Sequence, residues 1–170
     1  AAMITGTATD SVTEASGVLN GTAGDANASG DLDATDVDSS TAFAAQVAVA
    51  KTYGSFSIDA SGAWSYALDD SNAAVQALNT GDVLHELVTV ATADGTTQQI
   101  DVTINGANDA PVITGLATDS VTEASGVFNG TAGDAIAAGD LDATDVDSSA
   151  AFVAQVAVGK TYGSFSIDAS

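Results

Sequence analysis

Hydrophobic and polar residues alternate along several short stretches of the chain, and this alternation predicts strands rather than helices. Phe56 and Ile58 lie on one face of a stretch that leads into a turn at 59–62, and Trp64 and Tyr66 alternate beyond it. A period of two places every second side chain on the same face of a strand. Residues 55–68 are therefore predicted to form a β-hairpin.

The same pattern recurs over residues 83–104, where VLHELVTVAT and QQIDVTI flank the turn Ala93–Asp94–Gly95. Residues 45–49 supply a further strand. Residues 72–78 are the one predicted helical turn, with Ser71 or Asn72 as its cap. Roughly seven short strands with turns every 8–12 residues are typical of an all-β, Greek-key β-sandwich.

Residues 4–61 recur almost unchanged at residues 113–170, at an offset of 113 − 4 = 109 positions and without a gap. The two copies differ at seven of 58 positions: Thr7/Leu116, Leu19/Phe128, Asn27/Ile136, Ser29/Ala138, Thr41/Ala150, Ala44/Val153 and Ala50/Gly159. This period is too long for a solenoid and equals the size of one sandwich domain. We therefore expect a complete repeat over 1–109, a linker over 110–112, and the first half of a second, truncated repeat over 113–170.

The charge balance excludes several classes of partner. The chain has 23 acidic residues against two lysines, a net charge of −21, and no cysteine. With only two lysines it cannot neutralise nucleic-acid phosphates, and anionic membrane surfaces are disfavoured. No apolar run is long enough to span a bilayer. The absence of cysteine excludes disulfides and thiolate metal sites.

Twenty of the acidic residues are aspartate, which favours turns and oxygen-rich cation sites over helices. Asp31, Asp33, Asp36 and Asp38 fall within eight residues. Two carboxylates about 5 Å apart repel by roughly 3 kcal/mol at an effective dielectric constant near 20. A bound metal ion, protonation or local unfolding would relieve this repulsion. We expect calcium, although a solvated acidic loop explains the same cluster and Glu14 could be an ordinary surface charge.

Enzymatic activity is not expected. His85 is the only histidine, so we expect an exposed strand position rather than a zinc site. Serine and aspartate are abundant, but no Gly-x-Ser-x-Gly nucleophile motif is present. Tyr53, Trp64 and Tyr66 are interpreted as core and rim aromatics rather than as a platform for sugar stacking.

Several motifs occur in the same order as in a known family. They are NGANDAPVI (105–113), VTEASG (12–17 and 121–126), DATDVDSS (33–40 and 142–149) and YGSFSIDASGAWSYAL (53–68). They resemble the VCBS-type repeats of giant bacterial RTX adhesins and, more distantly, cadherin ectodomains. The resemblance implies an immunoglobulin-like or cadherin-like sandwich, exported by type I secretion and strung in many copies on the bacterial cell surface. It implies a role in cell adhesion or biofilm formation, with neighbouring repeats as partners.

Cadherin-like junctions place calcium between neighbouring repeats, and the resemblance transfers this role to matching positions. At the junction near the linker it implies the ligands Glu14, Asn108, Asp109, Asp145 and Asp147. In the complete repeat it implies Asp36, Asp38 and Asp94, with Asp69 in place of the cadherin Leu-Asp-Arg-Glu motif. In the truncated repeat it implies Glu123, the counterpart of Glu14.

Two function hypotheses remain open at the level of sequence. The first is a calcium-stabilised structural extender that projects an adhesive tip. The second is a calcium-dependent, lectin-like ligand-binding module, which a glycan array with and without calcium would identify. The near identity of the copies favours the extender. The truncated repeat would leave apolar strands open, so we expect strand-swapped self-association along residues 150–170.

Overall fold

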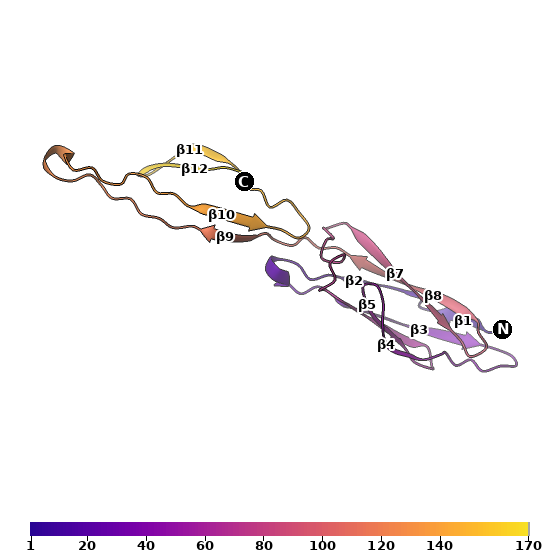
Figure 1. The fold of residues 1–170 in the computed structure, drawn as a ribbon. Coiled ribbons are helices and arrows are strands. Elements are labelled where there is room, and N and C mark those ends of the chain that lie inside the picture. Colours follow the sequence, from indigo (N-terminus) through magenta and orange to yellow (C-terminus); the bar gives the residue numbers. More distant parts are fainter. Residues whose placement is uncertain (170) are drawn as a thin grey trace. The chain divides into compact units, whose positions relative to one another are not determined.

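The computed structural model describes residues 1–169, and it is an all-β protein (Figure 1). The chain divides into two compact units. The first unit contains Ala1–Ala110 together with Val146–Ser148, and the second contains residues 111–145 and the residues from 149 onward. None of the helices within residues 1–169 has the length and apolar character needed to cross a membrane.

Two sheets make up the first unit. The larger is an antiparallel five-stranded sheet in the order β1 (Met3–Gly6), β3 (Asn27–Thr35), β6 (Ala63–Leu68), β5 (Gly54–Ile58) and β4 (Gln46–Ala50). The smaller has the order β2 (Thr9–Thr13), β8 (Thr97–Asn105) and β7 (Val83–Ala91). Strand β2 runs parallel to β8, and β7 runs antiparallel to it.

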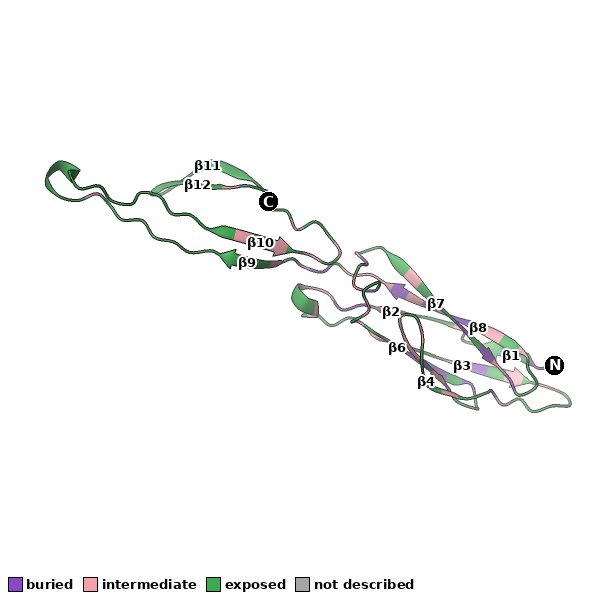
Figure 2. Ribbon diagram, viewed as in Figure 1, coloured by how far each residue is buried: buried purple, intermediate pink, exposed green. Residues whose placement is uncertain are grey.

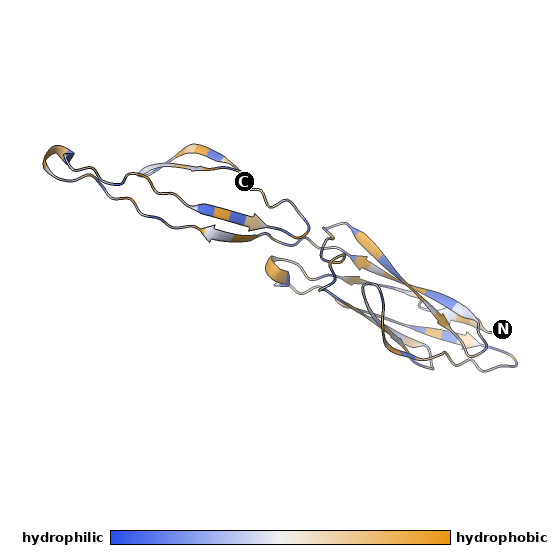
Figure 3. Ribbon diagram, in the orientation of Figure 1, coloured by the Kyte–Doolittle hydropathy of each residue, from blue (hydrophilic) through white to orange (hydrophobic). Residues whose placement is uncertain are grey.

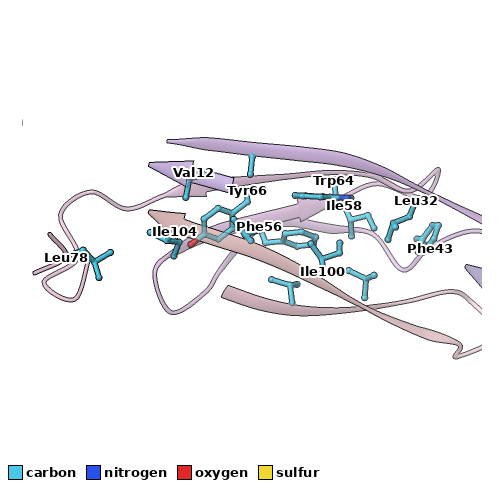
Figure 4. Packing of buried hydrophobic residues seen from close by; sticks show 14 residues of the cluster. Val12, Leu32, Phe43, Phe56, Ile58, Trp64, Tyr66, Leu78, Ile100 and Ile104 are labelled. Carbon is cyan, nitrogen blue, oxygen red and sulfur yellow. The ribbon is translucent and has the colours of Figure 1, made fainter. Parts of the chain in front are cut away.

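A single hydrophobic cluster joins the two sheets (Figure 4). Phe56 and Trp64 come from the larger sheet and stack with ring centroids 6.2 Å apart. Ile100 and Val102 come from β8, and both side chains are fully buried. Burial of apolar side chains from the facing sheets is the main favourable contribution to folding, and it makes the first unit a β-sandwich.

Both predicted hairpins are confirmed. In the first, β5 and β6 pair with Phe56 opposite Tyr66 and Ile58 opposite Trp64. In the second, β7 and β8 pair in register from Val83 opposite Asn105. The strand predicted at 45–49 is β4, displaced by one residue.

The predicted helical turn at 72–78 is a series of hydrogen-bonded turns rather than a regular helix. Asn72 caps it, because its side-chain oxygen accepts a hydrogen bond of 2.9 Å from the amide of Ala74. The amide of Gln76 donates to the Asn72 carbonyl at 3.0 Å, which closes one helical turn. Burial of Val75 and Leu78 attaches the segment to the sandwich.

The second unit consists of two separate antiparallel pairs. They are β9 (Val112–Leu116) with β10 (Asp140–Thr144), and β11 (Gln155–Lys160) with β12 (Gly163–Ile167). Each pair keeps the register of its counterpart 109 residues earlier: Met3 opposes Thr35 as Val112 opposes Thr144. Short 3₁₀ turns also recur as η1 (Val18–Asn20) and η2 (Val127–Asn129). The repeated sequence therefore forms these two strand pairs and the 3₁₀ turn twice, whereas the counterpart of β2 at 118–122 is not a strand.

Burial distinguishes the two units, as Figure 2 shows for each of them. Val12 is 1% exposed, whereas its counterpart Val121 is 60% exposed. Phe56 is fully buried, whereas Phe165 is 46% exposed. Strand β10 nevertheless keeps the alternation of hydrophobic and hydrophilic residues (Figure 3). The described part of the second unit has no counterparts of β6, β7 and β8, so this apolar pattern has no sheet to pack against.

Candidate metal sites in the first unit

Glu14 follows the end of β2 and is held in a fixed orientation by the backbone. Its amide donates to the carbonyl of Asn105 at 3.2 Å, and its Oε1 accepts a hydrogen bond of 2.9 Å from the amide of Ala107. The residue is only 1% exposed. Its second oxygen, Oε2, has no hydrogen-bond partner among residues 1–169. A buried carboxylate oxygen without a donor is unfavourable unless another group compensates it.

The negative charges of three aspartates, Asp70, Asp109 and Asp147, act on the carboxylate of Glu14. We call these four residues the Glu14 cluster. The amide of Ala15 donates to Asp70 Oδ1 at 3.1 Å. The amide of Asp109, a buried residue, donates to Asp147 Oδ2 at 2.9 Å. All four residues belong to the first unit, because that unit includes Val146–Ser148 although these residues follow the linker in sequence.

Burial raises the pKa of Glu14 from 4.5 to about 7. The hydrogen bond from Ala107 opposes this increase, while the negative charges of Asp109, Asp147 and Asp70 add to it. One pKa unit corresponds to about 1.4 kcal/mol, so an ionised Glu14 destabilises the fold by roughly 3 kcal/mol relative to an unperturbed glutamate. The cluster is therefore a buried site that favours either a proton or a cation.

A second group of carboxylates lies where the chain enters β1, and we call it the Asp36–Asp94 pair. The amino group of Ala1 lies 3.3 Å from Asp36 Oδ2 and 3.6 Å from Asp94 Oδ2. The amide of Ala2 donates to Asp94 Oδ2 at 2.8 Å. The two side chains are 2% and 12% exposed, respectively. Both carboxylates thus lie next to the backbone nitrogen of Ala1.

The Asp36–Asp94 pair differs from Glu14 in its protonation. Hydrogen bonds from Asp38, chiefly from its amide at 2.9 Å, hold the pKa of Asp36 below its usual range. The hydroxyl of Thr92, followed by the amide of Thr96, holds the pKa of Asp94 well below its usual range. Both aspartates are therefore ionised at neutral pH.

The structure brings together some of the residues that the resemblance implied. Glu14, Asp109 and Asp147 lie in one cluster, and Asp36 and Asp94 form a pair to which Asp38 contributes its amide.

Other implied residues lie elsewhere or make different contacts. Asn108 is exposed, and it donates from its amide to Thr80 Oγ1 at 3.1 Å and from its side chain to the Asp109 carbonyl. Asp145 belongs to the second unit, as does the exposed Glu123.

Asp69 has a local role in a turn. Its carboxylate accepts hydrogen bonds from the amide of Ser71 at 2.9 Å and from the Ser71 hydroxyl at 2.6 Å. The adjacent Asp70, which sequence reasoning did not select, contacts Ala15 and contributes to the Glu14 cluster. The two aspartates are neighbours in the turn after β6, and only the path of the backbone decides which of them faces Glu14.

The remaining candidates agree with their predicted roles. Nδ1 of His85, an exposed side chain, lies 2.8 Å from Asp101 Oδ1. Such exposed pairs contribute little to stability. Trp64 and Tyr66 are buried, and Tyr53 is half-buried against the core. Their interpretation as core and rim residues is confirmed.

Both sites offer only oxygen donors, and this chemistry fits calcium. Carboxylates and carbonyls are the ligands of hard cations, while zinc prefers cysteine and histidine. Across residues 1–169, no group of three or more His, Cys, Asp or Glu side chains is arranged so that it could hold a metal ion. Within each site the carboxylates are close enough to interact electrostatically. They do not form a complete coordination shell among the described residues.

Neither a protein-family model nor a curated protein matches the sequence.

Proposed function

We propose that this chain is part of a calcium-stabilised extender, a tandem array of sandwich repeats that projects an adhesive tip from a bacterial cell surface. The fold would be of the immunoglobulin-like or cadherin-like Greek-key type. The proposal is supported by the repeated sequence, the β-sandwich of the first unit and the acidic groups at its two sites. The role would be mechanical, without catalysis.

The burial of Glu14 among negative charges is the observation that carries this proposal. Its neighbours Asp70, Asp109 and Asp147 are all acidic. The lysine of the first unit, Lys51, lies over the ring of Phe56, with 5.8 Å between Nζ and the ring centroid. A divalent cation would neutralise the cluster and give Oε2 of Glu14 a partner, which residues 1–169 do not provide.

The sequence positions of these ligands favour a role at a joint. Glu14 and Asp109 precede Pro111, while Asp147 follows it. A cation held by residues from both sides of the linker would restrict the motion of the linker. Calcium suits this task because it accepts six to eight oxygens in flexible geometry. Glu14, Asp70, Asp109 and Asp147 would hold it, and carbonyls and water would complete the shell.

Calorimetry on the full chain tests calcium binding. The protein is first treated with EGTA and then titrated with calcium, with magnesium in a parallel sample. A ligand that binds only the folded state stabilises it by about 2.7 kcal/mol at a hundredfold excess over its Kd. We expect the melting temperature of the first unit to rise with calcium and much less with magnesium. An unchanged melting temperature would exclude the proposed site.

Small-angle scattering tests the mechanical role. We expect calcium to reduce the flexibility of the parent chain and to leave the double variant Asp145→Ala, Asp147→Ala unchanged. Asp142→Ala is the matched control, because Asp142 is an exposed residue of β10 in the same acidic motif. If the double variant responds to calcium as the parent does, these aspartates do not form the joint.

A further inference from the structure

Strand β7 forms an outer edge of the smaller sheet of the first unit, and within residues 1–169 it pairs with β8 alone (Figure 1). The amide of Ala44 donates to the carbonyl of Ala91 at 2.8 Å, so the backbone of Ala91 points away from β8. The backbone groups of alternate residues point to the same side of a strand. The open edge therefore carries the amides and carbonyls of Val83, His85, Leu87 and Thr89.

The other three edge strands of the first unit have features that oppose pairing with another chain. Strand β1 has only four residues. Strand β4 has five, and its register with β5 shifts between Gln46 and Val49, where Ala48 adopts a φ of 46°. Strand β2 has five and exposes Asp10. Short strands, bulges and edge charges discourage pairing, whereas β7 has nine residues in uninterrupted register and no proline.

The outward side of β7 is apolar and has no acidic side chain. Val83 is 52% exposed and Leu87 is 53% exposed, with His85 between them. Glu86, the one acid of β7, is buried on the opposite face. The carboxylate of Asp101 on β8 lies 2.8 Å from Nδ1 of His85. In a chain with a net charge of −21, this edge is thus a place where two copies can meet without juxtaposing exposed carboxylates of the paired strands.

We propose that the first unit associates with a second copy of this chain through β7, with the two edges paired antiparallel about a two-fold axis at His85. This register places Val83 of each copy opposite Leu87 of the other, so the exposed apolar side chains bury one another. The contact is isologous, because the same strand serves both copies. It depends neither on calcium nor on the Glu14 cluster.

The charges and contacts of β7 select this register over its neighbours. An axis at Glu86 would set two carboxylates opposite each other, in a pair whose Cα atoms are about 4.5 Å apart. An axis at Leu87 would place Val83 opposite Ala91, where the backbone of Ala44 already occupies the edge. The axis at His85 avoids both conflicts, because its ladder of hydrogen bonds ends at Leu87.

A single contact of this kind is weak. A stable interface contains about 20–30 residues a side, many more than one short strand supplies. We therefore expect dimerisation of the chain with a Kd on the order of 0.1–1 mM. In a tandem array, the first contact makes the following ones intramolecular, and avidity strengthens the pairing.

Antiparallel pairing also fixes the direction of the two chains. In the first unit, Ala2 is hydrogen-bonded to Thr96 just before β8 begins, and β8 extends to Asn105 near the linker. The chain thus enters and leaves the unit at opposite ends of β8, which is antiparallel to β7. The two chains therefore run in opposite directions along the contact. Combined with the proposed extender function, on which this last step alone rests, the pairing would join arrays that project from facing cells.

Sedimentation velocity on the full chain at concentrations up to about 1 mM tests the association. Roughly 1 M salt, with a Debye length of about 3 Å, screens the repulsion between the acidic chains. We expect the dimer fraction to rise with concentration equally in EGTA and in calcium. Leu87→Lys should weaken dimerisation by about tenfold or more, because the two-fold symmetry introduces a buried charge twice. The variant should stay folded, since residue 87 lies opposite Asp101 in β8.

Val47→Lys is the matched control and should dimerise normally, because Val47 is 84% exposed on β4, an edge strand of the larger sheet. Glu14→Gln should also dimerise normally, which separates this contact from the calcium site. A chain that stays monomeric throughout would overturn the proposal. A dimer that resists Leu87→Lys, that Val47→Lys weakens equally, or that forms only with calcium would also overturn it.

A cysteine at the axis reports the register directly, because the chain has no cysteine of its own. In the proposed pairing, residue 85 opposes residue 85 of the other copy with Cα atoms about 5.5 Å apart. A short bismaleimide should therefore join His85→Cys into covalent dimers much faster than Thr97→Cys, an exposed position on β8. Loss of the exposed His85–Asp101 pair should affect stability little. Equal rates for the two variants would contradict pairing through β7.

Discussion

Glu14 and Glu123 occupy the same position in two identical VTEASG motifs, yet Glu14 is 1% exposed whereas Glu123 lies at the surface. In the first unit, Ala107 donates a hydrogen bond to Glu14, and Asp109 and Asp147 contribute negative charge around it. The segment that follows β8, together with Asp147, creates this environment, and the described part of the second unit has no counterpart of it. The pair therefore provides an internal comparison between a buried and an exposed carboxylate.

Stability of the calcium-free protein should depend on pH through Glu14. Its pKa in the folded state, about 7, lies above the ordinary value of 4.5, so the protonated form favours folding. This contribution is fully present below pH 4.5 and is lost as pH rises through 7. We expect the free energy of unfolding to fall by roughly 3 kcal/mol across this window. Urea unfolding in EGTA between pH 4.5 and 8 measures it, and Glu14→Gln should remove the decline.

Calcium binding should release protons near pH 6. At that pH most Glu14 is protonated, while the cation requires the ionised carboxylate. The apparent affinity should therefore weaken below pH 7. Titration calorimetry in two buffers with different ionisation enthalpies counts the protons released. Equal binding heats in both buffers would show that Glu14 is not a ligand.

The variants Glu14→Gln and Glu123→Gln make the same substitution at the buried site and at its exposed counterpart. We expect Glu14→Gln to stabilise the calcium-free chain at pH 7.5 by about 1–3 kcal/mol, because it removes a buried charge. It should also abolish most of the calcium-dependent rise in melting temperature. Glu123→Gln should change neither quantity by more than about 0.5 kcal/mol, as is usual for exposed positions. Thermal unfolding with and without calcium measures both variants, and similar behaviour of the two would contradict a site at Glu14.

Phe56→Ala and Phe165→Ala compare the same residue in a closed and an open sheet. Phe56 is fully buried and stacks on Trp64, so its truncation should cost about 3–5 kcal/mol. Phe165 is 46% exposed, and its truncation should leave the first unit unchanged. Denaturant unfolding monitored by Trp64 fluorescence reports on the first unit in both variants. A large effect of Phe165→Ala would mean that the second unit contributes to the core of the first.

Gly54→Ala should destabilise the first unit by about 1–3 kcal/mol through overpacking. An added Cβ would lie 2.2 Å from the Ala67 carbonyl and 2.7 Å from the Tyr66 hydroxyl oxygen. The counterpart Gly163 has no atom within 4 Å of the equivalent position, so Gly163→Ala should be neutral in this chain. The difference between the two melting temperatures isolates the effect of β6, because the local sequences are the same.

The sequence by itself determined the local structure. Alternation at Phe56, Ile58, Trp64 and Tyr66 specified a hairpin and its register, because a shift by one residue would turn the aromatic side chains to the solvent. The near identity of the repeats fixed the same strand pairs in both units, even where no core forms. The acidic composition and the motifs around Glu14, Asp109 and Asp147 also indicated which side chains to expect at an oxygen-rich site.

Tertiary structure alone decided which of these residues experience burial and mutual repulsion. Asp70 rather than Asp69 faces Glu14, because Asp69 accepts the hydrogen bonds of Ser71 in its own turn. Glu14 and Glu123 have the same neighbours in sequence but differ in exposure, since solvation depends on strands distant in the chain. Hydrogen-bonded pairs and turns arise from local sequence, whereas a buried charge requires a complete pair of sheets to exclude water. For this reason the sequence specified two of the strand pairs twice, and only the packing of β6, β7 and β8 made one of the two copies a sandwich.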